Sequence, residues 1–265
     1  MIKFKTIGVL LRDSTQSYPI HYLKSLFEPL GAKLVVLNKH KHKPKRKLDL
    51  VIAMGGDGTV LQALDMLPNC PVLAINYGTV GFLTAGDRDD LTRLMERLVN
   101  NDYFLSERLL LRCDYQRKTV HAVNEVFLRS SRRMISVDVS VNGAKIRTIR
   151  GDGVILGTPT GSTGYLLSTG APLVMPDANC FILDGINEYN FSSRALILSS
   201  DAKIRLRVQS LLPNQEAQLV VDGNLVASLK EGEELVLTRS ERRAQLIFFE
   251  ENYFFHNLSS RLSWN

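Results

Sequence analysis

Apolar residues are arranged in two ways along the first part of the chain, and each way predicts a different element. Short, nearly continuous apolar runs of strand length alternate with segments in which apolar residues recur every three or four positions, as in a helix. The expected strands are Lys5 to Leu11, Lys33 to Asn38, Leu48 to Met54 and Pro71 to Asn76, and the expected helices cover residues 20–30, 59–67 and 90–99. This alternation predicts a parallel sheet with right-handed crossovers up to about residue 105.

From Leu109 onward the pattern changes to short strands separated by turns, with little sign of long helices. Two of the turns, Asn142-Gly143 and Asp222-Gly223, favour hairpins. The expected strands are Val120 to Arg129, Val137 to Val141, Lys145 to Arg150, Ala217 to Val221, Leu235 to Thr238 and Gln245 to Phe249. We therefore expect an α/β domain over residues 1–105 and a β-rich domain of two packed layers over residues 106–251. The apolar closing stretch, residues 252–265, should pack back on the first domain.

The junction after the strand Leu48 to Met54 is the centre of the predicted first domain. Gly55 to Gly58 breaks the strand, and Thr59 with Gln62 has capping-box spacing, so a helix should begin at Thr59. Such a turn aims backbone N–H groups and a helix N-terminus at one point, which suits a phosphate anion. The candidate phosphate-binding residues are Gly55, Gly56, Gly58 and Thr59.

Asp57 is the unexpected member of this turn. A carboxylate repels a phosphate unless a cation lies between them or the carboxylate handles a proton. Asp is also a common helix cap, which is the structural alternative. Because Thr59 is expected to fill that role, we favour a chemical function for Asp57.

Composition narrows the class of protein. The chain has 265 residues, of which 45% are hydrophobic and 23% charged, as is ordinary for a soluble globular protein. No apolar run reaches the ~18 residues of a membrane helix, and the N-terminal residues lack a signal-peptide pattern, so we expect a cytoplasmic protein that binds no membrane. Cys70, Cys113 and Cys180 are odd in number and widely spaced, which indicates core thiols.

The net charge of +6 and the basic run Lys39 to Lys47 raise the question of nucleic-acid binding. The run has no aromatic residues for base stacking and lies between two expected strands. We interpret it as a solvated loop, with no nucleic acid as partner. A supporting role in attracting anionic nucleotides is the alternative.

Three motifs in the second half differ from plain core or turn. Asn124-Glu125 places an amide and a carboxylate side by side in an apolar strand, so one side chain must face inward or the pair must lie at a strand end. Gly151-Asp152-Gly153 is a weak signal alone. Thr158 to Tyr165 (TPTGSTGY), followed by Ser168, offers hydroxyls, backbone N–H groups and a stacking ring, which suits a sugar, an amide or a base.

Taken in order, the motifs resemble those of the NAD kinase family. The first, Gly55 to Thr59 (GGDGT), is shared with diacylglycerol, sphingosine and phosphofructo-kinases, and its combination with TPTGSTGY is the specific part. The resemblance covers about residues 48–223. Its motifs are Gly55 to Thr59, Gly78-x-x-Gly81-Phe82-Leu83, Asn124-Glu125, Gly151 to Gly153 and Thr158 to Tyr165.

The resemblance implies a Rossmann-like N-terminal α/β domain, a β-sandwich-like C-terminal domain and a homodimer or homotetramer. It implies transfer of a phosphoryl group from ATP or polyphosphate to the 2′-hydroxyl of the adenosine ribose of NAD, with Asp57 as the catalytic residue. The implied NAD-binding residues are Gly58, Phe82, Asn124, Glu125, Asp152, Thr163, Gly164, Tyr165, Ser168 and Asn187.

The resemblance also implies a divalent cation, usually Mg²⁺. The chain's five histidines form no metal-ligand spacing on one element, apart from His40 and His42 in the basic run, so we predict no protein metal site and expect the cation to arrive with the donor. The chain departs from the family at Gly164, where alanine is common, and at Glu188-Tyr189, where the family has Pro-His. These departures concern the local shape of the pocket and the choice between NAD and NADH.

Two other functions share part of the pattern. A lipid kinase would share GGDGT, but it needs an apolar channel, and the polar motifs of the second half fit a dinucleotide better. A non-catalytic NAD-binding regulator would keep the pocket, but Asp57 indicates turnover.

Overall fold

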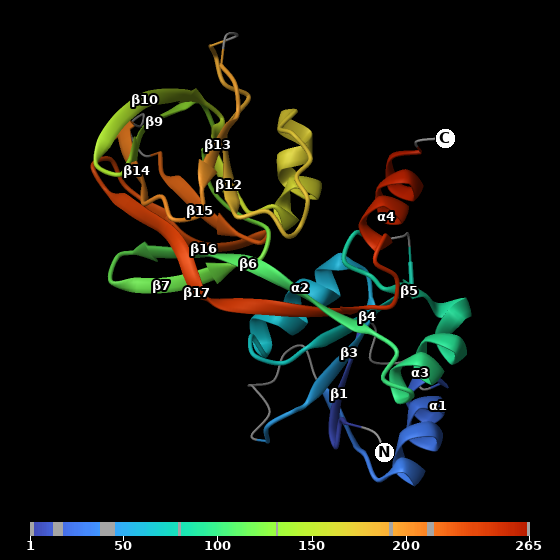
Figure 1. Ribbon diagram of the computed structural model, residues 1–265. Helices are drawn as coiled ribbons and strands as arrows, with labels where there is room; N and C mark the ends of the chain where they lie inside the picture. The colour runs from blue at the N-terminus through green and yellow to red at the C-terminus, as the bar shows by residue number, and fades with distance from the viewer. Residues whose placement is uncertain are drawn as a thin grey trace. The chain divides into compact units, whose positions relative to one another are not determined.

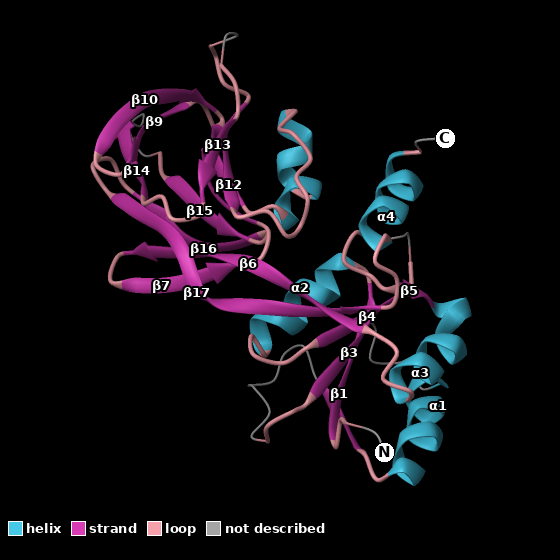
Figure 2. Cartoon of the chain, in the orientation of Figure 1, coloured by secondary structure: helices cyan, strands magenta, loops and turns pink. Residues whose placement is uncertain are grey.

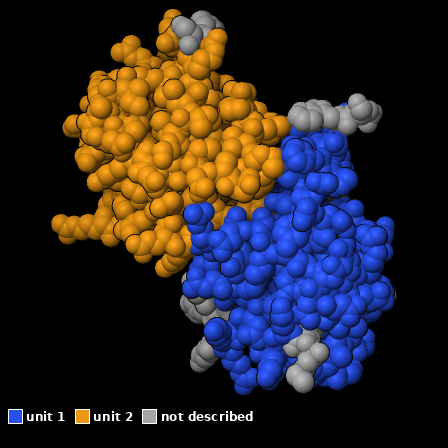
Figure 3. All heavy atoms as spheres, in the orientation of Figure 1, with its two compact units in different colours: residues 1–107, 243–265 blue, residues 108–242 orange. Residues whose placement is uncertain are grey.

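The computed structural model describes residues 3–12, 18–37, 46–78, 81–130, 132–190, 193–210 and 215–263. They form two compact units: unit 1 comprises residues 1–107 and 243–265, and unit 2 comprises residues 108–242 (Figure 3). The return to unit 1 comes at Arg243, earlier than the boundary expected after residue 251. The physical reason is that the end of a long strand, β17 (Glu234–Phe248), pairs with the sheet of unit 1.

Unit 1 contains the predicted parallel sheet. Its strands are β1 (Thr6–Leu11), β2 (Lys33–Leu37), β3 (Leu50–Gly55) and β4 (Val72–Asn76), in the order β2-β1-β3-β4. The end of β17 continues the sheet, since Leu246 and Ile247 pair in parallel with Val72 and Leu73, and the short β5 (Gly86–Asp87) also pairs with β4. Both β3 and β4 are buried along their whole length, which explains their nearly continuous apolar sequences.

Most helices of unit 1 flank this sheet, and the last one lies near β5 (Figures 1 and 2). They are α1 (Tyr18–Phe27), α2 (Asp57–Met66), α3 (Leu91–Val99) and α4 (Tyr253–Leu262), with short 3₁₀ turns at Glu28–Leu30 and Arg88–Asp90. Leu23 of α1 and Leu94 of α3 share a core with Ile52 of β3, whereas α2 lies on the opposite side of the sheet. Burying an aliphatic side chain of this size stabilises by ~1.5–3 kcal/mol. The α/β architecture predicted for this part is therefore confirmed.

Unit 2 is built from strands, as Figure 2 shows. In the described residues, β8 (Glu125–Ser130), β11 (Gly153–Gly157), β12 (Cys180–Ile186), β13 (Leu196–Ser199), β15 (Ala217–Val221) and β16 (Asn224–Leu229) form an antiparallel sheet in the order β13-β12-β11-β8-β15-β16. The second layer contains β6 (Phe104–Tyr115), β7 (Lys118–Ala122), β9 (Ile135–Val141), β10 (Ala144–Gly151), β14 (Ile204–Ser210) and part of β17. One apolar core joins residues of both layers, among them Val126, Val154, Val139 and Leu206. The β-sandwich-like prediction is confirmed.

Some expected strands have different limits. The predicted strand Val120 to Arg129 is two strands, β7 and β8, that are separated at Val123-Asn124. Conversely, the strands expected at Leu235 to Thr238 and Gln245 to Phe249 are the two ends of β17. Polar residues between these ends hid the continuity, because burial alternates along β17 instead of being continuous.

The remaining expectations from the sequence concern the cysteines, the basic run and membrane-spanning helices. The three cysteines are free, and burial raises the pKa of the Cys70 and Cys113 thiols to about 12, as fits core thiols. Residues 39–45 of the basic run lie outside the described residues. Among the helices that the structure describes, none combines the length and the apolar character needed to cross a bilayer.

Candidate active site

The turn between β3 and α2 begins a helix earlier than the sequence indicated. Helix α2 starts at Asp57 with Gly56 as its extended N-cap (φ −98°, ψ −172°), so the prediction of a start at Thr59 is wrong. Thr59 lies within the first helical turn and is buried, and its N–H donates to the Gly56 carbonyl at 2.9 Å. A glycine N-cap allows this start, and a carboxylate in the first turn is favoured by the helix dipole.

The glycines of this turn serve two purposes. A Cβ at Gly55 would lie 2.3 Å from Thr59 Oγ1, so Gly55 is needed for packing within the turn. At Gly56 and Gly58 an added Cβ would meet nothing within 4 Å. The open space in front of Gly56 and Gly58 is where a ligand can approach the backbone, and Gly55 is a structural residue.

The carboxylate of Asp57 is held by the segment that follows β4. Its Oδ2 accepts the N–H of Phe82 at 3.0 Å, and its Oδ1 accepts the N–H of Leu83 at 3.1 Å. A Cβ at Gly81 would lie 2.2 Å from Asp57 Oδ1, so this position admits only glycine without displacement. No side-chain hydrogen bond caps α2. Asp57 is therefore fixed in orientation, and each oxygen keeps a further lone pair for a ligand.

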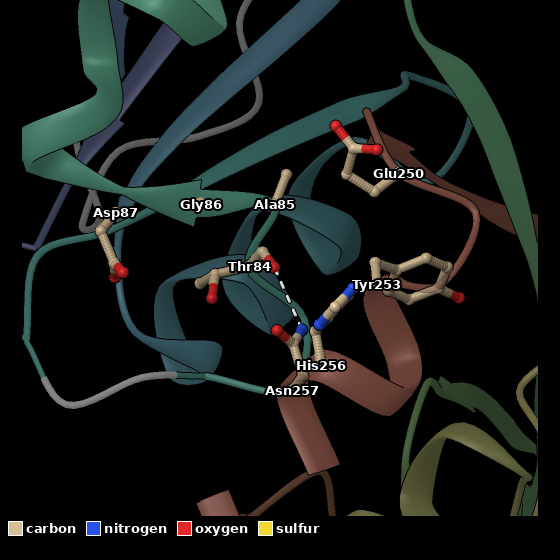
Figure 4. A pocket seen from close by; sticks show the side chains of 8 residues that line it. All are labelled: Thr84, Ala85, Gly86, Asp87, Glu250, Tyr253, His256 and Asn257. Carbon is tan, nitrogen blue, oxygen red and sulfur yellow. Dashed lines mark hydrogen bonds between the residues drawn. The ribbon is translucent and has the colours of Figure 1, made fainter. Parts of the chain in front are cut away.

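Helix α4, which is distant in sequence, contacts the same segment after β4. Asn257 Nδ2 donates to the carbonyls of Phe82 at 3.2 Å and Thr84 at 3.3 Å, and the Arg261 guanidinium lies 5.5 Å from the centre of the Phe82 ring. Figure 4 shows Asn257 beside Thr84 at the edge of a cavity of about 200 Å³. The lining residues are Thr84, Ala85, Gly86, Asp87, Glu250, Tyr253, His256 and Asn257.

A larger cavity lies directly in front of the glycine turn. It measures about 330 Å³ and is lined by Arg12, Gly56, Gly58, Thr59 and Gln62. The N-terminus of α2 and the Arg12 guanidinium both favour an anion there. Sequence reasoning missed Arg12, whose only signal is that it follows the first buried strand.

The second group of candidates lies in unit 2, at the start of β8. Glu125 is the first residue of the strand and is only 5% exposed, so the pair Asn124-Glu125 lies at a strand end, one of the two positions expected. Among the described residues, Asn124 Oδ1 and Glu125 Oε2 are buried without a hydrogen-bond partner. Two buried acceptors of this kind indicate a ligand that donates hydrogen bonds.

Burial, aided by the negative charge of Asp222, raises the pKa of Glu125 from its ordinary value of 4.5 to about 7. A hydrogen bond from the Tyr165 N–H acts in the opposite direction. An added Cβ at Gly164 would lie 2.8 Å from Glu125 Oε2 and 3.4 Å from Asn124 Nδ2. Glycine at this position thus leaves more space beside the Glu125 carboxyl than alanine would.

Hydroxyls of the TPTGSTGY loop make hydrogen bonds within unit 2. Thr158 Oγ1 donates to the Val123 carbonyl at 2.6 Å, Ser162 Oγ to the Pro159 carbonyl at 2.7 Å and Thr163 Oγ1 to the Thr160 carbonyl at 3.1 Å. Thr160 Oγ1 accepts from Arg108 at 3.3 Å. Each of these four hydroxyls therefore helps to hold the loop in place.

Tyr165 and Ser168 are the exposed members of this loop. Tyr165 is 39% exposed and packs edge-on against Phe127, with ring centroids 5.1 Å apart, whereas its neighbour Leu166 is fully buried. Ser168 is exposed in the second 3₁₀ turn, Tyr165–Thr169, which follows the turn Thr160–Thr163. Tyr165 is thus partly open to solvent directly after Gly164.

Asp152 and Asn187 form a separate pair. Asn187 Nδ2 donates to Asp152 Oδ2 at 2.8 Å. Glu125 pairs with Gly157 at one end of β11, whereas Asp152 immediately precedes Gly153 at the other end. At ~3.4 Å per residue the two pairs are roughly 15 Å apart. The structure brings Asn124, Glu125, Gly164 and Tyr165 together, and it places Asp152 and Asn187 elsewhere in unit 2.

Comparison with known proteins shows which family shares these sequence motifs and this fold. Two family models match the chain: the ATP-NAD kinase N-terminal domain over residues 22–103 and the ATP-NAD kinase C-terminal domain over residues 123–249. An NAD kinase of Caldicellulosiruptor saccharolyticus is 33% identical over 230 residues, which cover 86% of this chain and 87% of the relative. The chain belongs to the NAD kinase family.

Other NAD kinases agree. One from Geotalea daltonii is 32% identical over 225 residues, covering 82% of this chain and 78% of its own. The crystal structure of an Archaeoglobus fulgidus NAD kinase in complex with ATP has a TM-score of 0.81 and 28% identity, and covers 96% and 99% of the two chains. Yeast NADH kinase complexed with NADH matches with a TM-score of 0.88 over 98% and 88% of the chains; at 24% identity it shows the fold alone.

NAD kinases are kinases, so this chain is an enzyme of the phosphotransferase class. The resemblance that the sequence motifs indicated is thereby confirmed, and the comparisons favour neither a lipid kinase nor a non-catalytic regulator. Among the described residues, no group of three or more His, Cys, Asp and Glu side chains could hold a metal ion.

Proposed function

We propose that this NAD kinase transfers the terminal phosphoryl group of ATP to the 2′-hydroxyl of the adenosine ribose of NAD, with Asp57 aligning that hydroxyl and accepting its proton. The observation that carries this proposal is the Asp57 carboxylate. It is held by two backbone N–H groups beside a cavity suited to an anion.

The step requires little covalent chemistry from the protein. A bond forms between the ribose O2′ and the terminal phosphorus, the bond from that phosphorus to the bridging oxygen breaks, and ADP leaves. The hydroxyl proton passes to Asp57. Phosphoryl transfer depends mainly on positioning and charge stabilisation, and a carboxylate with fixed orientation provides the first.

The donor phosphates are assigned to the cavity in front of α2. Its N-terminus, the backbone at Gly56 and Gly58, and the Arg12 guanidinium offer positive potential there. A divalent cation, which we propose to be Mg²⁺, would neutralise phosphate charge when bound. Asp57 is the only carboxylate of the turn, so the donor phosphates themselves would supply most of the ligands of the cation. ATP is the proposed donor, and polyphosphate is the alternative.

The adenosine ribose is assigned to Asn124 and Glu125. Their buried acceptors, Asn124 Oδ1 and Glu125 Oε2, lack protein donors among the described residues, and ribose hydroxyls are donors of the required kind. Thr163, Gly164, Tyr165 and Ser168 would line the pocket beside them, and Phe82 would contact the adenine.

Asp152 and Asn187 require a different arrangement. Since they lie at the opposite end of β11 from Glu125, we propose that they contact the nicotinamide end of an NAD held largely by a neighbouring subunit of a homo-oligomer. The oligomer would be a homodimer or homotetramer.

The proposed activity is tested by incubating the pure protein with ATP, Mg²⁺ and NAD and detecting NADP with an NADP-specific dehydrogenase. NADP should accumulate with time and enzyme concentration. If neither ATP nor polyphosphate yields NADP, while diacylglycerol or sphingosine is phosphorylated, the proposal is wrong.

Tyr165→Ala should raise the apparent KM for NAD by about tenfold, the lower end of the effect of removing an aromatic ring that stacks on a base. The KM for ATP and the melting temperature should stay near wild type, because the ring is 39% exposed. Steady-state kinetics with each substrate varied in turn provide the measurement.

Leu166→Ala is the matched contrast, since its side chain is fully buried in the adjacent position. It should lower the melting temperature without a selective effect on NAD. If Tyr165→Ala behaves in the same way, Tyr165 is a core residue and not a wall of the pocket.

A further inference from the structure

Asp222 lies outside every group of candidate residues described so far. It occupies the turn between β15 and β16 with a left-handed backbone (φ +44°), followed by Gly223 (φ +79°). The sequence motif Asp222-Gly223 predicts such a hairpin, and an aspartate whose only task is the turn would direct its side chain to solvent or to its own backbone.

The Asp222 carboxylate instead bonds to the strand end that carries the two buried acceptors. Oδ2 accepts the N–H of Val123 at 2.8 Å, and Oδ1 accepts the N–H groups of Asn124 at 2.8 Å and Glu125 at 3.1 Å. Its own N–H donates to the Glu125 carbonyl at 3.1 Å. Hydrogen bonds to a carboxylate are stronger than those between neutral groups, so this contact fixes three consecutive residues.

Thr158 holds the other side of the same backbone. Its N–H donates to the Asn124 carbonyl at 2.8 Å, and its hydroxyl donates to the Val123 carbonyl at 2.6 Å. Val123 and Asn124 lie between β7 and β8, where a regular ladder does not constrain them, and Glu125 is the first ladder residue of β8, paired with Gly157. The conformation of Val123 and Asn124 therefore depends on Asp222 for the N–H groups and on Thr158 for the carbonyls.

We propose that Asp222 is a positioning residue for NAD: by accepting the three N–H groups of residues 123–125, it fixes the Asn124 and Glu125 side chains for the adenosine ribose. This inference rests on the proposed role of Asn124 and Glu125 in NAD binding.

The charge of Asp222 provides a second effect that a purely structural role lacks. Its carboxylate is the charged group that acts on Glu125 from the hairpin, while the Tyr165 N–H and the Asn124 amide are the neutral groups around it. Removing the charge should lower the pKa of Glu125 from about 7. Since the ionised carboxylate is the better acceptor for a ribose hydroxyl, the acid limb of NAD binding should move to lower pH.

Asn142 offers a matched control in the same unit. It occupies the left-handed turn position before Gly143 in the β9–β10 hairpin, with φ +51°. Its Oδ1 accepts the Lys203 N–H at 2.9 Å, and its N–H donates to the Lys203 carbonyl at 2.9 Å. Asn142→Ala thus removes the same kind of side-chain-to-backbone contact at a site without candidate NAD residues.

The test compares Asp222→Asn, Asp222→Ala and Asn142→Ala by calorimetric titration with NAD and by steady-state kinetics between pH 5.5 and 8.5, values chosen to bracket pH ~7. Asp222→Asn keeps the turn and one carbonyl acceptor. It should weaken NAD binding by about tenfold, the change that loss of one hydrogen bond to a charged group produces. The KM for ATP should stay within about twofold. The acid limb should move to lower pH.

Asp222→Ala should weaken NAD binding further, and Asn142→Ala should leave NAD binding and the acid limb as in wild type. If Asp222→Ala does not fold, Asp222→Asn alone decides. The proposal is overturned if Asp222→Asn binds NAD like Asn142→Ala and its acid limb does not move. Failure of wild type to form NADP would overturn the proposed function instead, and the calorimetric comparison of NAD binding would still decide on Asp222.

Discussion

Asp57→Asn should lower kcat for NADP formation by about a hundredfold or more, while NAD binding measured by calorimetry stays within a few-fold of wild type. General-base assistance is typically worth ~10²–10⁴-fold, or about 3–5 kcal/mol of barrier. A loose transition state depends less on the base and more on positioning, which is why the lower end of that range is expected. Asparagine preserves the size of the side chain but removes its charge and basicity.

The same substitution also affects stability. Asparagine has one carbonyl oxygen, so it can accept only one of the two N–H groups of Phe82 and Leu83 in the original geometry. It also removes a negative charge from the first turn of α2, which costs ~0.3–1 kcal/mol. The melting temperature should therefore fall by a few degrees.

Asp65→Asn separates these effects. Asp65 is exposed on the same helix, and its substitution changes the same charge away from the glycine turn. It should keep the wild-type kcat. If Asp57→Asn retains most of its kcat and only melts earlier, Asp57 is a structural residue and the proposed mechanism is wrong.

Glu125→Gln should remove a large pH dependence of the stability of the ligand-free protein. The pKa of Glu125 is raised from 4.5 to about 7 in the folded state. When folding raises the pKa of a carboxyl, its contribution to stability is fully present at pH values below the pKa of the unfolded chain. This contribution is lost as the pH rises through the pKa of the folded protein. At about 1.4 kcal/mol per pH unit the loss between pH ~4.5 and ~7 is on the order of 3 kcal/mol.

Urea unfolding at constant ionic strength and several pH values between ~4.5 and ~8 measures this effect. The free energy of unfolding of Glu125→Gln minus that of wild type should increase as pH rises and level off above pH ~7, which means that the variant becomes more stable relative to wild type. Glu216→Gln, an exposed glutamate of the same unit, should follow wild type throughout. If the difference in unfolding free energy between Glu125→Gln and wild type does not change with pH, the folded protein does not raise the pKa of Glu125.

NAD should oppose this destabilisation, because the ionised Glu125 carboxylate accepts from the ribose hydroxyls in the proposed complex. Saturating NAD should stabilise wild type more at pH ~8 than at pH ~6. Glu125→Gln should lose most of that difference. The ionisation of Glu125 and the binding of NAD are therefore expected to be coupled.

The alternation of strands and helices in unit 1 could be predicted because it depends on local periodicity, as β1, β3 and β4 show. The helix start could not be predicted correctly, because a glycine N-cap leaves no side-chain signal and Thr59-x-x-Gln62 imitated a capping box. A short motif can therefore identify a turn and still misplace its first helical residue.

Residues that act over long sequence distances were missed for a different reason. Asp222 contacts Val123 across 99 residues, and an Asp-Gly hairpin carries no sign of that contact. The hydrogen bonds of the Thr158, Ser162 and Thr163 hydroxyls could not be predicted, because their partners are backbone carbonyls, which every sequence offers equally. The motif was recognised correctly, but the task of its individual atoms depends on the fold.

The hydrogen bond from Asn257 to the Phe82 carbonyl has a consequence for the synthesis of the enzyme. The two residues are 175 positions apart, and the N–H of the same Phe82 holds Asp57. At ~5–20 residues per second a ribosome needs roughly ten seconds or more to add the intervening chain. A nascent polypeptide therefore carries Asp57, the proposed catalytic residue, well before the segment that supports it is complete, and we expect full phosphoryl-transfer activity only after α4 has emerged and docked.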